Sequence, residues 1–357
     1  MWWIAIIMLI FTALLIDGAR MVRNPSRNSR AGPLRCCCAV LVFVLTKITY
    51  PWRLKSKFRM IVFDTLRFIQ KIASPNTIKV GLDVVVFIFN TIIWRGTTGK
   101  SEYVLIPVEN TSFVRALRMC TKESRMNDIK ICVLYFHGGG YFCGNEKLYY
   151  PAHMEWLKES GPSMEIVSVE YALSNHELAL KQCWGALMWY RRLYPRRKII
   201  LAGDSAGGCI AIRLAMKERP PVEGLVLISP WVVQDTRASS FHRNRNSDYI
   251  TTEFVQIASS LHGLKLTDPV VSPLFCPLGA FQNLPRTLLV WGEAELFRDD
   301  IMSFASRLTR EGVPVSISRG TNKPHIWPLL YPWLYQNDAV ETLREIASFC
   351  LLALRDS

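Results

Sequence analysis

The 357-residue sequence lacks the residue patterns that mark the common metal sites. It contains no CxxC pair and no HExxH motif, so neither a zinc knuckle nor a zinc-peptidase helix is predicted. Apart from the run at 36–38, its ten cysteines stand singly, which is typical of buried free thiols rather than of a disulfide framework. Internal repeats and low-complexity tracts are also absent, which excludes solenoids. We therefore expect no metal and no cofactor.

Acidic residues are nearly absent from the start of the chain. Positions 1–60 hold ten Lys and Arg against the single acid Asp17, and so carry +9 of the net charge of +14. A nucleic-acid-binding protein usually spreads its basic residues over a folded face, whereas these flank apolar runs. The arrangement favours a membrane with anionic headgroups as the partner and does not indicate nucleic acid.

Residues 1–16 form an apolar run broken only by Thr12, which as a helix would be about 24 Å long. A cleavable signal peptide requires basic residues before its apolar region. No Lys or Arg precedes the run at 1–16. We therefore expect an uncleaved membrane anchor, with a cleaved signal or an interfacial helix as the alternatives. The cysteines at 36–38 are candidates for acylation, the alternative being that they only add apolar surface.

A second apolar run, at 36–46, leaves the membrane topology open. It is shorter than a typical span. If both runs span, the rest of the chain is lumenal; if only the first spans, it is cytosolic. The triplet Asn110-Thr111-Ser112 is a glycosylation acceptor pattern, which favours the lumen.

From residue 129 onward, short apolar runs alternate with helical patterns. This rhythm predicts an α/β fold with a mainly parallel sheet covered by helices on both faces. We expect residues 1–52 to be the anchor and basic segment, 53–125 linker or lid helices, and 126–357 the main domain with an insertion at 232–270. The expected strands are Ile131–Phe136, Ile166–Glu170, Ile199–Ala202, Leu225–Ile228, Thr287–Trp291 and Val313–Ile317. The expected helices are Glu146–Glu159, Glu177–Leu193, Gly207–Lys217, Ile301–Arg310 and Val340–Leu354.

A serine lies at a predicted strand-to-helix turn. The motif Gly203-Asp204-Ser205-Ala206-Gly207 directly follows the strand expected at 199–202 and opens a helical pattern. Its glycines allow a tight turn that raises the Ser205 hydroxyl above the sheet, as in a nucleophile elbow. The alternative is a purely structural glycine turn, but the strand before and the helix after favour the elbow.

A glycine run follows the strand expected at 131–136. In His137-Gly138-Gly139-Gly140, three residues without side chains leave backbone N–H groups open to a substrate carbonyl oxygen. With the N–H of Ala206 they would form an oxyanion hole, in which each donor contributes about 2.7–4 kcal/mol. The alternative is a phosphate-binding loop, but neither GxGxxG nor GK[ST] follows.

A serine nucleophile needs a base, and the base needs an acid to orient it. His325 is the late histidine of the six and follows the last expected strand. In this kind of fold the chain order is Ser, acid, His, which places the acid after the strand at 287–291. That loop offers Glu293, Glu295, Asp299 and Asp300.

Together these motifs resemble the hormone-sensitive-lipase family of α/β-hydrolases, which includes arylacetamide deacetylases and a fungal steryl acetyl hydrolase branch. The matching segments are 137–140, 167–171, 203–208, Ser229-Pro230-Trp231 and 325–327. The resemblance covers about residues 130–350. It implies an α/β-hydrolase fold and makes Glu295 the triad acid, with Asp299 next; the family commonly has Asp there. It also implies that segments 53–100 and 232–269 form a cap over the site.

The resemblance further implies a membrane-anchored serine carboxylester hydrolase at the endoplasmic reticulum. Its substrates would be short acyl esters of apolar alcohols, steryl acetates being the example. Acylglycerols, arylacetamide-type xenobiotic esters and an acyltransferase reaction are alternatives. A catalytically silent lipid-binding protein on the same fold is the alternative from another class, although Ser205 and His325 are both in place.

Overall fold

The computed structural model describes residues 63–64, 66–67, 70–71, 74–79, 82, 99–108, 112–217, 222–261, 263–330 and 334–355. The predicted anchor at 1–52, with the cysteines at 36–38, lies outside these residues, as do Asn110 and Thr111 of the acceptor triplet. Within the described part of the chain, no helix combines the length and apolarity that a membrane span requires. Anchoring, acylation and topology therefore stay predictions.

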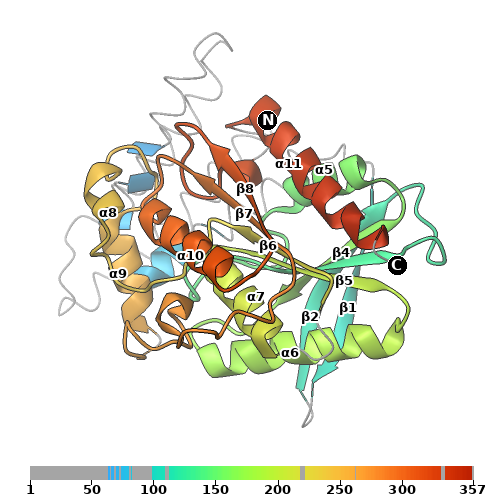
Figure 1. Cartoon of the computed structure of the whole chain (residues 1–357). Coiled ribbons are helices and arrows are strands. Elements are labelled where there is room, and N and C mark those ends of the chain that lie inside the picture. Colours follow the sequence, from blue (N-terminus) through green and yellow to red (C-terminus); the bar gives the residue numbers. More distant parts are fainter. Residues whose placement is uncertain are drawn as a thin grey trace, which may run out of the picture.

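A single eight-stranded sheet runs through the middle of the molecule in the order β1-β2-β4-β3-β5-β6-β7-β8 (Figure 1). β1 pairs antiparallel with β2, and β2 antiparallel with β4. All other neighbours are parallel. The strands are β1 (Gly99–Val108), β2 (Ser112–Thr121), β3 (Ile131–Phe136), β4 (Met164–Glu170), β5 (Lys198–Asp204), β6 (Gly224–Ile228), β7 (Thr287–Gly292) and β8 (Val315–Gly320).

Helices cover both faces of this sheet because the central strands are apolar on both sides. In β3, Ile131, Val133 and Tyr135 pack on one face with α5 and α11, while the residues between them pack on the face of α6, α7 and α10. α5 and α11 lie against each other in Figure 1. These helices are α5 (Tyr150–Ser160), α6 (His176–Leu193), α7 (Ser205–Lys217), α10 (Arg298–Arg310) and α11 (Gln336–Leu351). The insertion after β6 carries α8 (Ser239–Arg243) and α9 (Thr252–Leu261).

The expectation of linker or cap helices throughout 53–125 is wrong for residues 99–121. They form the β1–β2 hairpin, which extends the sheet beyond β4. Their strand character is hidden because the hairpin is at the edge of the sheet and half solvated, so Glu102, Arg115 and Arg118 interrupt the apolar pattern. The described residues 63–64, 66–67, 70–71 and 75–79 are helical.

The loops that follow the carboxyl ends of β3, β5, β6, β7 and β8 carry most of the candidate functional residues. In open parallel sheets this edge is where ligand sites form. Residues 137–140 follow β3, Ser205 follows β5, and Ser229 follows β6. Glu295 follows β7 and His325 follows β8.

Candidate active site

Ser205 occupies a strained turn between β5 and α7. Its φ is +49°, a left-handed conformation that a serine rarely adopts. Gly203 and Gly207 make this turn fit. A Cβ on Gly203 would lie 2.4 Å from the carbonyl oxygen of Gly207, and a Cβ on Gly207 would lie 2.0 Å from that of Phe136. The turn therefore has the geometry of a nucleophile elbow. Ser205 is 8% exposed.

Asp204 lies buried beneath the elbow and fixes the neighbouring loop. The hydroxyls of Tyr135 and Tyr149 each donate to its carboxylate at 2.7 Å, and the N–H of Gly138 donates at 2.8 Å. Burial raises the pKa of Asp204 to about 7, against these hydrogen bonds, which lower it. The Gly138 N–H is thus already used, which corrects its assignment to the oxyanion hole. Gly138 instead holds the loop against Asp204.

The remaining glycines form a curved loop. Gly139 has φ +112°, Gly140 φ +61°, and Tyr141 continues the left-handed run at φ +63°. The Gly139 carbonyl accepts from the N–H groups of Phe142 and Cys143, which turns the chain back on itself. Consecutive backbone N–H groups in such a turn make an anion-binding concavity. The N–H groups of Gly139, Gly140 and Ala206 are therefore the candidate oxyanion donors.

His137, which opens this loop, has a structural position. Its ring stacks on Tyr171 with the centroids 4.4 Å apart, and the Tyr171 hydroxyl donates to the His137 carbonyl at 2.5 Å. Burial lowers the pKa of His137 to about 4, so the imidazole is neutral at neutral pH. Its contacts fix the start of the glycine loop.

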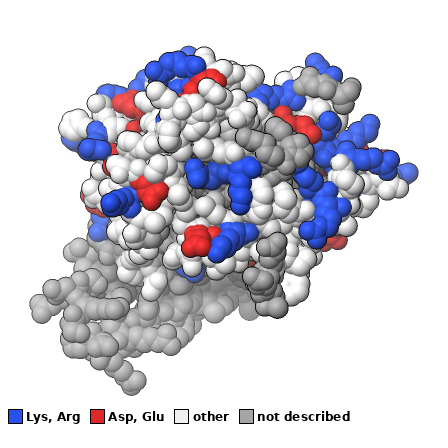
Figure 2. Space-filling view, turned by 60° about the horizontal axis from the view of Figure 1, so that its bottom comes forward, with Lys and Arg blue, Asp and Glu red and all other residues white. Residues whose placement is uncertain are grey.

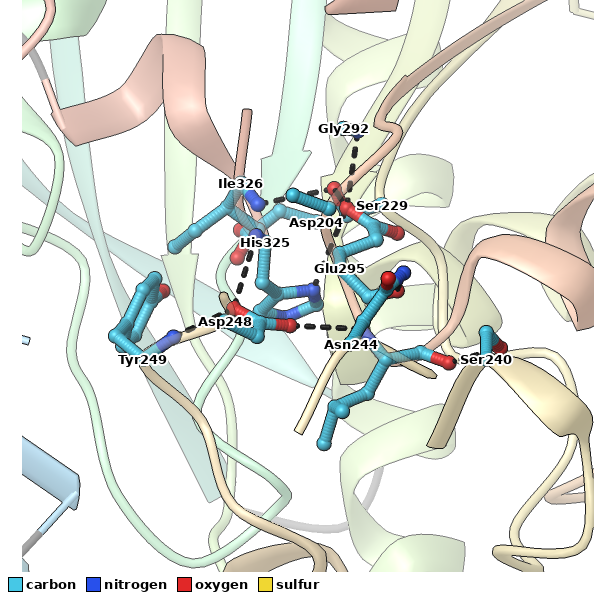
Figure 3. A network of polar contacts seen from close by, with 12 residues as sticks. Asp204, Ser229, Ser240, Asn244, Asp248, Tyr249, Gly292, Glu295, His325 and Ile326 are labelled. Atoms are coloured by element: carbon cyan, nitrogen blue, oxygen red, sulfur yellow. Dashed lines mark hydrogen bonds and ion pairs between the residues drawn. The ribbon is translucent and has the colours of Figure 1, made fainter. Parts of the chain in front are cut away.

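Glu295 and His325 lie together in the buried space behind the loops (Figure 3). Glu295 Oε2 is 3.9 Å from His325 Nδ1, and neither side chain is exposed beyond 4%. The same carboxylate oxygen accepts from the Ser229 hydroxyl at 2.6 Å and from the Gly292 N–H at 3.1 Å. The pair is therefore oriented, and an approach of about 1 Å would complete the acid–imidazole hydrogen bond.

The other carboxylates of the β7 loop have different partners. Asp299 accepts from Arg243 at 2.6 Å and from Arg298 at 2.8 Å. Glu293 is half-buried and lies 3.9 Å from Arg319. Within this loop, the structure brings Glu295 to the candidate base.

Burial also sets the ionisation of the pair. Burial lowers the pKa of His325 to about 3, so the imidazole is neutral at neutral pH. Burial raises the pKa of Glu295, whereas the hydrogen bond from Ser229 lowers it. The ring of Phe297 meets that of His325 edge-on at 5.0 Å, which contributes to the exclusion of water. A hydrogen bond to an ionised Glu295 would raise the basicity of this imidazole, which is the role of the acid that orients a general base.

Three residues around the pair were not predicted to have a role. Ser229 bridges two loops, since its hydroxyl donates to Glu295 and accepts from the Ile326 N–H at 2.9 Å. Asn244 donates to the carbonyl of Glu295 at 2.7 Å. Asp248 accepts from the backbone of both catalytic loops. The motif Ser229-Pro230-Trp231 contributed to the resemblance, but nothing in the sequence marks Asn244 or Asp248.

The described side chains form no group of three His, Cys, Asp or Glu suited to a metal ion.

Comparison with known proteins gives the same fold. Residues 133–329 match the family model described as alpha/beta hydrolase fold. The chain is 30% identical over 285 residues to the carboxylesterase/phospholipase LipF of Mycobacterium tuberculosis, covering 74% of this chain and 73% of LipF. It is 29% identical over 272 residues to the esterase LipU of the same organism, covering 72% of this chain and 89% of LipU.

Solved structures agree. The structure of a hormone-sensitive-lipase homologue from a metagenome library superposes with a TM-score of 0.69 at 23% identity, covering 82% of this chain and 97% of that one. The esterase of the archaeon Pyrobaculum calidifontis superposes with a TM-score of 0.68 at 24% identity, covering 80% and 96%. The chain thus belongs to the alpha/beta hydrolase family that this model describes. It is a carboxylic ester hydrolase.

Proposed function

We propose that the protein is a membrane-anchored serine esterase that removes short acyl groups, such as acetyl, from apolar alcohols such as sterols. One observation supports the catalytic part most strongly. Ser205 is held at φ +49° between β5 and α7, and the buried pair of Glu295 and His325 follows it in the chain order of an α/β-hydrolase triad.

In the proposed reaction the neutral His325 takes the proton of the Ser205 hydroxyl as its oxygen attacks the ester carbonyl. The negative charge on the tetrahedral intermediate is stabilised by the N–H groups of Gly139, Gly140 and Ala206. The imidazolium, stabilised by Glu295, then protonates the leaving alcohol. Water activated by His325 hydrolyses the acyl-enzyme and restores Ser205.

The surroundings of the glycine loop support an apolar substrate. A Cβ on Gly140 would lie 2.9 Å from the Cβ of Ala258 in α9, so the insertion packs directly on this loop. Phe142 and Phe254 meet here with ring centroids 5.4 Å apart. Such aromatic walls favour an apolar alcohol or acyl chain over a charged one. Acylglycerols and xenobiotic esters contain the same ester bond and are alternative substrates, which the outcomes of the test below bear on.

The membrane part of the proposal depends on the apolar and basic residues 1–52. On the face shown in Figure 2, Lys and Arg side chains are spread over the view, with the largest group on the right and Asp and Glu among them. The ten Lys and Arg at positions 1–60 flank apolar runs, which favours a membrane with anionic headgroups as the partner. An endoplasmic reticulum membrane is the location we propose.

The test compares wild type with Ser205→Ala in membranes. The substrates are p-nitrophenyl acetate, p-nitrophenyl palmitate and a steryl acetate, and fluorophosphonate labelling reports the nucleophile directly. We expect acetate and steryl acetate turnover and labelling in wild type, and loss of all three in the variant.

Each other outcome has a definite meaning. Palmitate turnover that depends on Ser205 would make the protein an acylglycerol lipase. Transfer of acetyl to an added lipid alcohol would make it an acyltransferase. Absence of any Ser205-dependent turnover and labelling would leave a lipid-binding protein on a hydrolase fold.

A further inference from the structure

Asp248 lies in the insertion after β6 and is completely buried. Its Oδ1 accepts from the backbone N–H of Tyr249 at 2.8 Å and of His325 at 3.2 Å, and its Oδ2 accepts from the N–H of Leu296 at 2.8 Å (Figure 3). Leu296 is the residue next to Glu295. One carboxylate therefore binds the backbone of both loops that carry the proposed acid and base.

These two loops need such a link because they come from different strands. The loop of Glu295 follows β7 and that of His325 follows β8, and their side chains are 3.9 Å apart at Oε2 and Nδ1. A displacement of about 1 Å from the productive geometry can cost about 100-fold in rate. The position of the two loop backbones relative to each other thus determines whether the pair can act.

The segment around Asp248 is itself held from the N-terminal side. Arg67 donates to the carbonyls of Asn246 at 2.9 Å and Asp248 at 2.6 Å. Gln70 donates to the carbonyl of Tyr249 at 3.2 Å and accepts from the N–H of Thr251 at 2.9 Å. Both ends of the Gln70 amide are thus used.

We propose that Asp248 is a positioning residue that sets the distance between Glu295 and His325, and that Arg67 and Gln70 hold Asp248 in place. This inference rests on the proposed triad. It makes the helical residues Arg67 and Gln70 and the insertion part of one brace behind the active site. The brace acts on the catalytic loops through their backbones and does not contact the substrate.

The main test is Asp248→Asn in the full-length chain, measured with p-nitrophenyl acetate. Asparagine has the same shape as aspartate, but its side chain has one acceptor oxygen in place of two. Its NH₂ group would face a backbone N–H, so the hydrogen bond to one of the two loops is lost. We expect kcat to fall about 10- to 100-fold with KM within about twofold. The rate of fluorophosphonate labelling should fall in parallel, since His325 must activate Ser205 in both reactions.

Glu223→Gln is the matched control. Glu223 also accepts a backbone N–H, that of Ile199 at 2.8 Å, but at the amino end of β5, away from the catalytic loops. We expect its kcat to stay at the wild-type value. Arg67→Met and Gln70→Leu act one step further from the loops and should give losses of about 3- to 10-fold in kcat, again without a change in KM. They also test the inference if Asp248→Asn does not fold.

Two results would overturn the inference. One is a kcat in Asp248→Asn, or in Arg67→Met if the first does not fold, that equals that of Glu223→Gln. The other is a loss of activity that is fully explained by a smaller amount of folded protein. In that case the protein that does fold reacts with the fluorophosphonate at the wild-type rate. Ser205→Ala distinguishes failure of this inference from failure of the proposed function. If the Ser205→Ala variant keeps its activity, the proposed triad itself is wrong.

Discussion

Backbone strain at single residues concentrates around the proposed triad. Ser205, Ser229 and Ile326 have φ of +49°, +46° and +47°. For a β-branched residue such as Ile326 this conformation is especially rare. Strained conformations persist where the surrounding structure enforces them, and they cluster at active sites. Here the Ile326 N–H is directed to the Ser229 hydroxyl, and that hydroxyl is directed to Glu295.

Ser229→Ala tests this bridge. The substitution removes the donor to Glu295 and the acceptor for the Ile326 N–H, so the carboxylate loses part of its orientation. We expect kcat for an acetate ester to fall about 10- to 100-fold with little change in KM. Steady-state kinetics with Ser303→Ala as the control measures this, because the exposed Ser303 hydroxyl donates to the carbonyl of Asp299 within α10. Equal rates in the two variants would show that the bridge does not orient the acid.

At the scale of elements, a buried ionic cluster joins the β1–β2 hairpin to the parallel sheet. Glu165 of β4 is completely buried, 2.6 Å from Arg118 of β2 and 2.7 Å from Arg197 before β5. Tyr190 of α6 also donates to its carboxylate. A buried carboxylate is tolerated when it is paired and fully hydrogen-bonded. The cluster thus replaces apolar packing at the edge where the sheet changes from parallel to antiparallel.

Glu165→Gln should destabilise the fold, because it removes the buried counter-charge of two largely buried guanidinium groups and leaves Arg118 only the exposed Glu102 at 3.7 Å. We expect a loss of about 3 kcal/mol in the free energy of unfolding, measured by denaturant titration. Glu177→Gln is the control, since its partner Lys181 and Glu177 itself are both mostly exposed. That control should leave the denaturation midpoint unchanged. A similar midpoint for both variants would mean that the cluster contributes nothing to stability.

Over the whole molecule, buried titratable groups make the free energy of unfolding change with pH in opposite directions. Burial lowers the pKa of His153 to about 3, and burial raises that of Asp204 to about 7. Below pH 6.5 the unfolded chain takes up a proton at His153 that the folded chain refuses, so this group makes stability fall with falling pH. Asp204 is protonated in the folded chain up to about pH 7, so its contribution is lost as the pH rises from about 4 to 7.

His153→Phe isolates the histidine contribution. His153 is 1% exposed, neither ring nitrogen has a hydrogen-bond partner in the described structure, and its ring packs against Tyr135 and Trp156. Between pH 6 and 4 we expect wild type to lose about 1.4 kcal/mol more stability per pH unit than the variant. Denaturant titrations at several pH values give the slope of the unfolding free energy against pH for each protein. Any pH-independent loss of stability caused by the substitution does not change this slope. Trp156→Phe, the control, should keep the wild-type slope.

The sequence by itself determined the order and approximate bounds of the parallel strands and the residue types of the site. β3 spans the residues expected, and β4 to β7 differ from expectation by at most two residues at either end, because their apolar runs are buried on both faces. β8 begins two residues later and ends three later than expected, since its exposed residues break the apolar run. The motifs around Ser205, and the position of Glu295 and His325 after late strands, follow from local residue patterns.

Tertiary structure alone decided what holds these residues in place. The hairpin at 99–121 was missed because its exposed face carries charges, and the role of Gly138 changed because Asp204 accepts its N–H. Asp248 lies 47 residues before Glu295 and 77 before His325. Such contacts depend on how separate loops meet at one edge of the sheet. No local pattern encodes them, because the hydrogen bonds go to backbone groups that every residue type presents alike.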